Sequence, residues 1–321
     1  MSARLPVGVI GTGALGRHHA RHLSTLEGVE LVGICDSNPE TGERVATEVG
    51  TSHVADLDAL LGKVRAVSIA VPTSVHHSVG RRALERGVAV LMEKPLTATL
   101  EEADDLVALA ETEGVPLAVG HIERFNRAVR AALPLLDGPR FAEAERVAPF
   151  TVRGTDVPVV LDLMIHDLDL VLHLTGGREA TEVRAVGVPV LSPHVDIANS
   201  WVEFAGGAVA NVTTSRLGLK RERRLRLVQP NGYFSLDLAA GTGVFFRLRE
   251  GWSPGQGTAL EDAVEMQQLQ APEGDALRME LASFTRAVRG DGMVAVSGAE
   301  GRAALALALR VGEAVRHFHA R

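Results

Sequence analysis

The chain has 321 residues, about twice the length of a typical domain, with 46% apolar and 23% charged residues. This composition is typical of a folded globular protein and excludes disordered, collagen-like and fibrous classes. The formal net charge of −7 gives no electrostatic footprint for nucleic acid or for an anionic membrane surface.

Two further features favour the cytoplasm. The single cysteine, Cys35, cannot form an intrachain disulfide, and Met1–Pro6 leaves no room for a signal peptide before the apolar run that follows. No apolar stretch approaches the roughly 20 residues that a membrane span needs. We therefore expect a cytoplasmic protein with neither nucleic acid nor membrane as a partner.

Up to about residue 120 the chain alternates short apolar runs with amphipathic stretches. The runs have strand length and β-branched content. They are Pro6–Ile10, Val29–Cys35, Ala66–Val71, Val88–Met92 and Val115–Val119. The stretches between them have helical spacing, so the pattern predicts a parallel sheet covered by helices on both faces.

After residue 120 the pattern changes to helices and then to successive strands. Helices are expected over Asn126–Leu136 and over Val157–Thr175, where Pro158 lies in the first turn. Strands with hairpin-type turns follow between Glu182 and about Leu269. Four of these strands are Val195–Phe204, Ala208–Thr214, Arg224–Gln229 and Tyr233–Leu238.

The C-terminus returns to helix over Ala276–Arg289 and Gly298–His319. The change of pattern predicts two domains, residues 1–120 and residues 121–321. The C-terminal helix could pack back on the first of them.

A glycine-rich turn follows the first expected strand. Gly11-Thr12-Gly13-Ala14-Leu15-Gly16 is G-x-G-x-x-G, and Asp36 ends the second strand, twenty residues after the last glycine. In this context the glycines allow a pyrophosphate to approach the backbone at a helix N-terminus. Asp36 would accept hydrogen bonds from ribose hydroxyls and repel a 2′-phosphate, which favours NAD over NADP. The alternatives are a turn without a ligand and Asp36 as a helix cap. The predicted cofactor contacts here are Gly11, Gly13, Ala14, Leu15, Gly16 and Asp36.

The 33 basic residues include only three lysines, and one of them, Lys94, lies in Glu93-Lys94-Pro95 at the end of an expected strand. Ligands bind outside the carboxyl ends of strands in open parallel sheets, so Lys94 should border the nicotinamide. A lysine there can stabilise an alkoxide as hydride leaves and, when desolvated, can lose its proton, which arginine cannot do. The alternative is a solvated loop lysine.

Asp162 and His166 are four residues apart in an apolar stretch, which puts them on one face of the expected helix. His166 could take a hydroxyl proton while hydride departs, and Asp162 could bind a second hydroxyl or orient the imidazole. A structural pair or a metal half-site are the alternatives. His166, Asp169 and His173 also share a stripe, but without an H-E-x-x-H motif we expect no catalytic metal.

Together these residues resemble the family of glucose–fructose oxidoreductase and inositol 2-dehydrogenase, the Gfo/Idh/MocA family. The resemblance rests on the glycine-rich turn, on Val71-Pro72-Thr73 followed by His76, on Glu93-Lys94-Pro95 and on Asp162-x-x-x-His166. It implies an N-terminal Rossmann domain and a C-terminal α+β domain. The second domain would have an open, mostly antiparallel sheet whose exposed face makes a homodimer or homotetramer.

The same resemblance implies roles for individual residues. Lys94 would be the catalytic lysine, His166 the general acid and base, and Asp162 a ligand of a substrate hydroxyl. Four further residues would lie along the cofactor beside Lys94, namely Pro72, Thr73, His76 and Glu93.

Gly120–Asn126 and Val160–Asp169 are similar to the family branch of UDP-N-acetylglucosamine 3-dehydrogenases. In bacteria that branch feeds a transaminase that makes a 3-amino sugar of lipid A. A nucleotide-sugar substrate needs cations for its diphosphate, and a guanidinium suits phosphate oxygens. Candidates are Arg124, Arg153 and Arg216, each of which could instead be a surface or ion-paired arginine. Phe125 could stack on uracil, and Asn126 completes the substrate contacts expected from this segment.

The leading hypothesis is therefore NAD-dependent oxidation of a secondary sugar hydroxyl, most sharply C3 of UDP-N-acetylglucosamine. The first alternative is a dehydrogenase of a free sugar, an inositol or a sugar acid. The second is a regulator that senses NAD or sugar without catalysis. Such relatives typically lack the lysine or the histidine, whereas Lys94 and His166 are both present.

Overall fold

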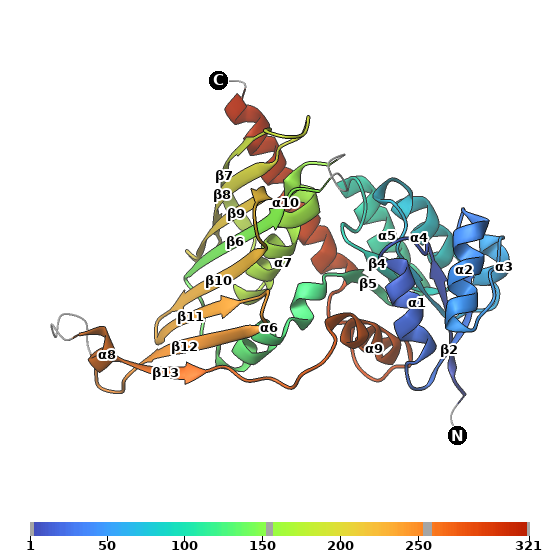
Figure 1. Ribbon diagram of the computed structural model, residues 1–321, viewed down its shortest axis with the longest axis horizontal. Coiled ribbons are helices and arrows are strands. Elements are labelled where there is room, and N and C mark those ends of the chain that lie inside the picture. The colour runs from blue at the N-terminus through green and yellow to red at the C-terminus, as the bar shows by residue number, and fades with distance from the viewer. Residues whose placement is uncertain (1–2, 152–156, 253–258, 320–321) are drawn as a thin grey trace. The chain divides into compact units, whose positions relative to one another are not determined.

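The computed structural model describes residues 3–151, 157–252 and 259–319 (Figure 1). The chain divides into two compact units. The first contains Met1–Ile122 and Gly274–Leu305, and the second contains Glu123–Glu273 and Ala306–Arg321. None of the helices in the described ranges has the length and apolar character that a membrane crossing requires.

The first unit is built on a five-stranded parallel sheet with the order β2-β1-β3-β4-β5. Its strands nearly coincide with the five apolar runs, so the predicted parallel sheet is confirmed. They are β1 (Leu5–Ile10), β2 (Val29–Cys35), β3 (Ala66–Ile69), β4 (Ala89–Glu93) and β5 (Leu117–Gly120). Because the strand order reverses between β1 and β3, the carboxyl ends of these strands form the crevice where open sheets bind ligands.

Helices cover both faces of this sheet. They are α1 (Gly16–Ser24), α2 (Pro39–Val49), α3 (Leu57–Leu61), α4 (His76–Leu84), α5 (Leu100–Glu113) and α9 (Ala276–Val288), with a 3₁₀ turn η1 (Thr73–Val75). Alternation along β1 directs Val7 and Val9 into a cluster with residues of α1, α2 and α9. On the opposite face α4 approaches closely, since a Cβ on Gly80 would lie 2.8 Å from the Met92 side chain.

The segment Gly274–Leu305 packs with the first unit, although the sequence grouped it with residues 121–321. Leu281 and Phe284 of α9 are buried in the same cluster as β1 and α1. At the start of α10 (Gly298–His319), a Cβ on Gly301 would lie 2.3 Å from the Val119 side chain. Helical periodicity shows that one face of these helices is buried, but it does not show which unit covers that face.

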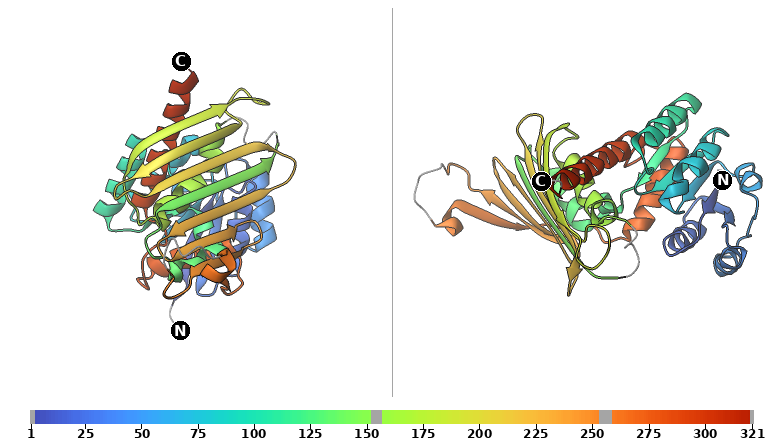
Figure 2. Two further views of the ribbon diagram at one scale, coloured as in Figure 1. Left: turned by 90° about the vertical axis from the view of Figure 1, so that its left-hand side faces the viewer. Right: turned by 90° about the horizontal axis from the view of Figure 1, so that it is seen from above.

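The second unit contains an eight-stranded, mostly antiparallel sheet with the order β13-β12-β11-β10-β6-β9-β8-β7 (Figure 2, left). Its strands are β6 (Phe141–Pro149), β7 (Ala180–Val188), β8 (Ile197–Phe204), β9 (Val209–Gly218), β10 (Glu222–Gln229), β11 (Gly232–Asp237), β12 (Thr242–Leu248) and β13 (Val264–Gln268). Only the β6 and β9 pairing is parallel among the described pairs of this sheet. The predicted α+β class of this domain is confirmed.

Strand β6 lies inside the sheet but was not expected from the sequence. Its buried positions are Ala142, Ala144 and Arg146. Two small residues and an arginine do not produce the apolar alternation by which strands are recognised. Arg146 can be buried because distant carboxylates neutralise its charge, as described below.

Helices of the second unit cover one face of its sheet. They are η2 (Ile122–Phe125), α6 (Arg127–Ala132), η3 (Leu133–Leu135), the π-helical turn η4 (Val160–Met164), α7 (Ile165–Leu174) and the part of α10 from Ala306 onward, while α8 (Leu260–Ala263) precedes β13. The helix expected over Asn126–Leu136 is thus a short α-helix followed by a 3₁₀ turn. The helix expected over Val157–Thr175 contains a π turn, and such turns are rare and recur at functional sites.

Candidate active site

The glycine-rich turn joins β1 to α1 at the carboxyl edge of the parallel sheet. Gly11 has a φ of +80°, and a Cβ there would lie 2.7 Å from the carbonyl oxygen of Ala70. A Cβ on Gly16 would lie 1.8 Å from the carbonyl oxygen of Gly11. Glycine is therefore required at residues 11 and 16 by the backbone and its packing alone.

Neither conformation nor packing explains the middle glycine, Gly13. It is not among the glycines with positive φ, and a Cβ there would meet no described atom within 4 Å. Ala14 and Leu15 beside it are also exposed, Leu15 with 47% of its surface. The open space lies at the start of α1, where backbone N–H groups attract a pyrophosphate. The turn thus fits a dinucleotide, which would account for the missing side chain.

The variant Gly13→Ala should separate cofactor binding from folding. Because the added methyl group meets no described atom, we expect the melting temperature without NAD to equal that of the wild type. The methyl group would stand where the pyrophosphate approaches, so the KM for NAD should rise by about tenfold or more, at least about 1.4 kcal/mol. Gly16→Ala is the contrast, since its clash should lower the melting temperature even without NAD. Unchanged NAD affinity in folded Gly13→Ala would contradict the assignment.

Asp36, at the end of β2, is held by donors of its own chain. Its Oδ2 accepts from the Thr12 backbone N–H at 2.6 Å and from the Thr12 hydroxyl at 2.8 Å. Its Oδ1 accepts from the backbone N–H of Asn38 at 2.8 Å. Burial alone would raise the pKa of Asp36, but the N–H of Asn38 and both donors of Thr12 hold it below its ordinary value. The carboxylate is therefore ionised and oriented before any ligand arrives.

Three side chains meet behind the Glu93-Lys94-Pro95 turn. His19 and Ser68 are buried, and Glu93 keeps 13% of its side-chain surface exposed. His19 of α1 lies between the other two, with Nδ1 2.7 Å from Ser68 Oγ and Nε2 3.0 Å from Glu93 Oε1. The second oxygen of Glu93 accepts from the backbone N–H of Lys94 at 3.2 Å. Burial alone would raise the pKa of Glu93, but His19 and the charge of Lys94 hold it below its ordinary value. His19 thus orients the carboxylate that precedes Lys94.

Replacing His19 by asparagine should destabilise the protein by about 1.5–3 kcal/mol, the contribution of a hydrogen bond to a charged group. The effect should depend on pH, because a carboxyl whose folded pKa is lowered adds its full stability above its unfolded pKa and loses it as the pH falls through the folded pKa. For Glu93 that unfolded value is near 4.5. The difference in unfolding free energy should be full at neutral pH, begin to shrink as the pH falls below this value, and be lost once the pH is below the lower pKa of the folded state.

The neighbouring residue gives the matched control for this experiment. His18 lies on the same helix but is exposed. His18→Asn should therefore melt at the wild-type temperature across the pH range. A loss in His19→Asn that does not vary with pH would show that the Glu93 carboxylate is not its cause.

His76, the first residue of α4, contacts two backbone carbonyls. Its Nε2 lies 2.9 Å from the oxygen of Val71, and its Nδ1 lies 2.9 Å from the oxygen of Pro95. The buried ring therefore ties the loop after β3 to the turn that carries Lys94. In that loop Pro72 is exposed and Thr73 is half-buried. Their contact with the cofactor, and that of His76, stays a prediction.

In the second unit, Asp162 lies in the π turn and His166 in the first turn of α7. Both side chains are partly exposed, whereas Met164 and Ile165 between them are buried. The spacing of four residues thus spans a junction between a π turn and an α-helix rather than one regular helix. The two residues expected to do chemistry remain accessible while their neighbours form the core.

Arg124, expected to bind substrate, is buried in an ion pair. Its Nε and Nη2 donate to the two carboxylate oxygens of Asp169 at 2.8 and 2.7 Å, and its Nη1 lies 2.7 Å from His173 Nδ1. This bidentate arrangement joins η2 to α7.

Within the described ranges no group of three or more histidine, cysteine, aspartate or glutamate side chains could hold a metal ion.

The other residues expected to contact substrate have different surroundings. The Oδ1 of Asn126 caps α6 by accepting from the Ala128 N–H, and its Nδ2 donates to Glu123. Phe125 is half-buried, and Arg153 lies outside the described residues. Contacts of these residues and of Arg124 with a substrate stay predictions.

Four charged side chains form a cluster between η2, α7 and the sheet. Arg146 of β6 donates from Nε and Nη2 to Asp167 at 2.7 and 2.8 Å. Its Nη1 donates to Glu123 Oε1 at 3.0 Å, and the same oxygen accepts from Nη1 of Arg223 on β10 at 3.0 Å. Burial opposes the charge of Arg146, but Asp167 and Glu123 outweigh it and raise its pKa above the ordinary value. The cluster ties α7, which carries His166, to the sheet.

Arg216 of β9 is also held by its own chain. Its Nη2 donates to the carbonyl oxygen of Val157 at 2.7 Å, and its Nε lies 3.7 Å from Asp196. The Asp196 carboxylate accepts from the Ser192 hydroxyl and from the backbone N–H groups of residues 190–192. Burial would raise the pKa of Asp196, but these donors hold it far below its usual range. Asp196 thus orders the loop before β8.

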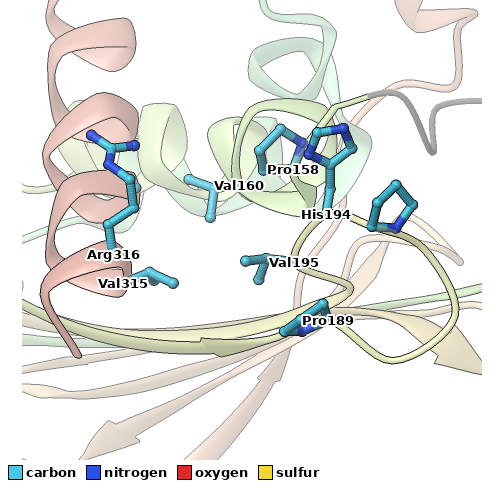
Figure 3. A pocket seen from close by; sticks show the side chains of 9 residues that line it. Pro158, Val160, Pro189, His194, Val195, Val315 and Arg316 are labelled. Carbon is cyan, nitrogen blue, oxygen red and sulfur yellow. The ribbon is translucent and has the colours of Figure 1, made fainter. Parts of the chain in front are cut away.

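This loop borders a cavity of about 310 Å³ between the start of the π turn and α10 (Figure 3). Its walls are mostly apolar, including Pro158, Pro189 and Val315, while His194 and Arg316 add polar atoms. The described residues that line it do not include Asp162 or His166. The cavity is therefore separate from the residues expected to do the chemistry.

Two family profiles match the chain. Residues 5–121 match an oxidoreductase family with an NAD-binding Rossmann fold, and residues 140–235 match the Gfo/Idh/MocA C-terminal domain. The chain belongs to the Gfo/Idh/MocA family. The resemblance inferred from the motifs is confirmed, and with it NAD as the cofactor and oxidoreductase as the enzyme class.

This Gfo/Idh/MocA protein is similar over its length to a UDP-N-acetylglucosamine 3-dehydrogenase of Acidithiobacillus ferrooxidans. The identity is 40% over 312 residues, 97% of each chain. A solved structure of UDP-N-acetylglucosamine 3-dehydrogenase from the same organism superposes with a TM-score of 0.92 at 39% identity, covering 100% of both chains. A scyllo-inositol 2-dehydrogenase (NAD(+)) of Bacillus subtilis is 31% identical over 236 residues, 67% of this chain and 68% of that one. The chain is thus an oxidoreductase that acts on CH–OH groups.

Some contributing residues of this Gfo/Idh/MocA protein were not found from the sequence. Thr12, inside the glycine motif, carries a hydroxyl beside Asp36, and no spacing rule points to it. The sequence indicates His19 only weakly, as a polar residue on the helix face that also contains Ala20 and Leu23 and is therefore expected to be buried. Arg223 is one of several arginines on a strand, and only the pairing of β10 with β6 shows its position.

Proposed function

We propose that this protein oxidises the C3 hydroxyl of UDP-N-acetylglucosamine with NAD and forms the 3-keto sugar nucleotide. The observation that carries the proposal is 40% identity over 97% of the chain with an enzyme named for that reaction. Lys94, Asp162 and His166 are all present. Their presence favours an enzyme over a regulator that only senses NAD or sugar.

NAD supplies the hydride acceptor when it is bound at the glycine-rich turn. In the proposed reaction Lys94 hydrogen-bonds the substrate hydroxyl and stabilises the alkoxide as the C–H bond breaks. His166 accepts the hydroxyl proton, and Asp162 binds a neighbouring hydroxyl or orients the imidazole. The products are a ketone, NADH and a proton held by His166, so electrons and protons balance.

The direct test is to mix purified protein, NAD and UDP-N-acetylglucosamine and to follow NADH by its absorbance. We expect NADH to form, and to form in greater amount when an aminotransferase and an amino donor remove the ketone. The branch assignment fails if no sugar nucleotide produces NADH.

Oxidation of an inositol or a free sugar is the second candidate, favoured by 31% identity over 67% of the chain with a scyllo-inositol 2-dehydrogenase. A ligand stabilises the folded state by mass action, so thermal shift can rank the substrates. We expect UDP-N-acetylglucosamine to raise the melting temperature more than inositols or sugar acids at equal concentration. Equal or greater stabilisation by a free polyol would favour the second candidate.

The uncovered face of the eight-stranded sheet is the proposed interface of a homodimer or homotetramer. Six strands place apolar residues in one registered row across it. The row contains Val209, Phe141, Val228, Tyr233, Phe246 and Met266. Val228 and Met266 keep 41% and 66% of their surface exposed in the single chain. Such a contiguous apolar patch is typical of an interface.

Val228→Glu should weaken this assembly, because it would bury a carboxylate in an apolar contact. Light scattering is expected to show a dimer or tetramer for the wild type and smaller particles for the variant. Glu145, on the same sheet face but away from the row, gives the control Glu145→Gln with unchanged mass. A monomeric wild type at high concentration would rule out the interface.

The proposal also assigns roles to the two units and a place in the cell. NAD would bind to the first unit, residues 1–120 in the division made from sequence, and the second unit would recognise the substrate and assemble. The proposed location is the cytoplasm, which cell fractionation would test.

A further inference from the structure

We propose that Arg223 binds the diphosphate of a nucleotide-sugar substrate. The inference rests on the proposed function and names a residue that the sequence motifs did not single out. Arg223 lies in β10, in the arginine-rich stretch Arg221-Glu222-Arg223-Arg224-Leu225-Arg226.

Alternation along β10 places Arg223 on the helix-covered face of the sheet. Leu225 is buried on that face, whereas Arg224 and Arg226 are exposed on the other. Arg223 is the register partner of Arg146 in β6. Since Arg146 is bonded to Asp167, the residue after His166, Arg223 belongs to the same cluster that anchors the catalytic helix α7.

Arg223 is the accessible member of this cluster. Its side chain is 31% exposed, against 3% for Arg146. The two other arginines considered for the diphosphate within the described ranges, Arg124 and Arg216, are each only 5% exposed and have guanidinium donors committed within the protein. A ligand can therefore reach the fork of Arg223, whose planar donors suit phosphate oxygens.

The charge of Arg223 is only partly compensated by its own chain. Its partner Glu123 shares one carboxylate oxygen, Oε1, between Arg223 and Arg146. Burial and the neighbouring charge of Arg146 lower the pKa of Arg223 below its ordinary value, despite the attraction of Glu123. An anion next to Arg223 would offset both the burial of its charge and the repulsion from Arg146. The pyrophosphate link of a nucleotide sugar is such an anion.

The test compares Arg223→Gln with Arg224→Gln, a change at the next residue on the opposite face of the same strand. Arg223→Gln should raise the KM for UDP-N-acetylglucosamine by about 10- to 100-fold, the range for loss of a charge-assisted contact. The KM for NAD and the melting temperature should stay at their wild-type values. Arg224→Gln should leave both KM values unchanged. Arg223→Lys should give a smaller rise, because an ammonium keeps the charge but lacks the fork.

Binding of UDP alone, measured by calorimetry, makes the inference independent of turnover. We expect Arg223→Gln to weaken UDP binding and to reduce its dependence on salt. If Arg223→Gln binds UDP as the wild type does, the inference is overturned, while NADH production by the wild type would still support the proposed function. If the wild type makes no NADH from sugar nucleotides but Arg223→Gln loses UDP affinity, the proposed function is contradicted, while the binding of the diphosphate by Arg223 is still supported.

Two further outcomes decide between sources of the anion and between binding and folding. A rise in the KM for NAD rather than for the sugar nucleotide would place the cofactor pyrophosphate at Arg223 and overturn the inference. If Arg223→Gln melts early, Arg223→Lys carries the test, since its cation preserves the pair with Glu123. If folded Arg223→Lys has the wild-type KM for UDP-N-acetylglucosamine and binds UDP as the wild type does, the proposed binding of the diphosphate by the Arg223 guanidinium is contradicted.

Discussion

Replacing Lys94 by alanine should reduce kcat by about 10²- to 10⁴-fold, the usual contribution of a positioned proton-transfer group. The expected cause is loss of the group that stabilises the alkoxide as hydride leaves. NAD should still bind, because the glycine-rich turn and Asp36 are formed by other residues of the first unit. His166→Ala should have an effect of similar size through loss of the proton acceptor. Stopped assays for NADH and titration of NAD binding measure the two properties separately.

The lysine content of the chain provides the control. Lys63 is exposed in a loop, and Lys220 is exposed and paired with Glu222 at 2.8 Å. Lys63→Ala and Lys220→Ala should therefore keep wild-type turnover. Lys94→Arg tests proton loss separately from charge, because a guanidinium does not deprotonate in proteins. Full activity in Lys94→Arg would show that a fixed positive charge is sufficient. Full activity in both Lys94→Ala and His166→Ala would refute the mechanism.

The fold of the first unit could be predicted because four of its five strands are buried on both faces along almost their whole length. Such strands are continuous apolar runs. The edge strand β2 has an exposed residue, Glu30, but the rest of its run is apolar and predicts its observed bounds, Val29–Cys35. In the second unit the strand β6 escaped prediction because Arg146 occupies a core position. Its burial depends on Asp167 and Glu123, which come from elements outside the strand. The pattern of apolar residues along the sequence identifies strands with apolar cores. Burial of a charged residue depends instead on partners that are distant in the sequence and become neighbours only in the fold.

The same distinction applies to the candidate site. Gly11–Gly16, Lys94 and the Asp162–His166 pair could be singled out because their meaning depends on short spacings and on position after a strand. Arg124 has the residue type that a diphosphate requires, but its donors are engaged by Asp169 and His173. The π turn at Val160–Met164 could not be anticipated, since an apolar stretch favours any helical winding and packing selects the wider turn.

Asp36→Asn should raise the KM for NAD by about 10- to 100-fold, the range for a hydrogen bond to a charged group. A carboxylate offers about four acceptor positions, and three are filled by Thr12 and Asn38. The remaining acceptor position can bind a ribose hydroxyl. The side-chain amide of asparagine has only one accepting oxygen, and in one of its two orientations it would present its NH₂ donor to that hydroxyl instead. Steady-state kinetics at fixed saturating substrate measures this change.

Thr12→Val isolates orientation from charge, because it removes the hydroxyl donor but leaves the carboxylate and the Thr12 backbone N–H. We expect a smaller rise in the KM for NAD than in Asp36→Asn. Asp36→Ser combined with Asn38→Arg should in addition admit NADP, since it removes the repelling carboxylate and supplies a guanidinium for a 2′-phosphate. If Asp36→Asn leaves the KM for NAD unchanged and the double variant gains nothing with NADP, Asp36 is a structural cap. The bonds to Thr12 and Asn38 would then be the whole of its role, and the preference for NAD would have to arise elsewhere in the first unit.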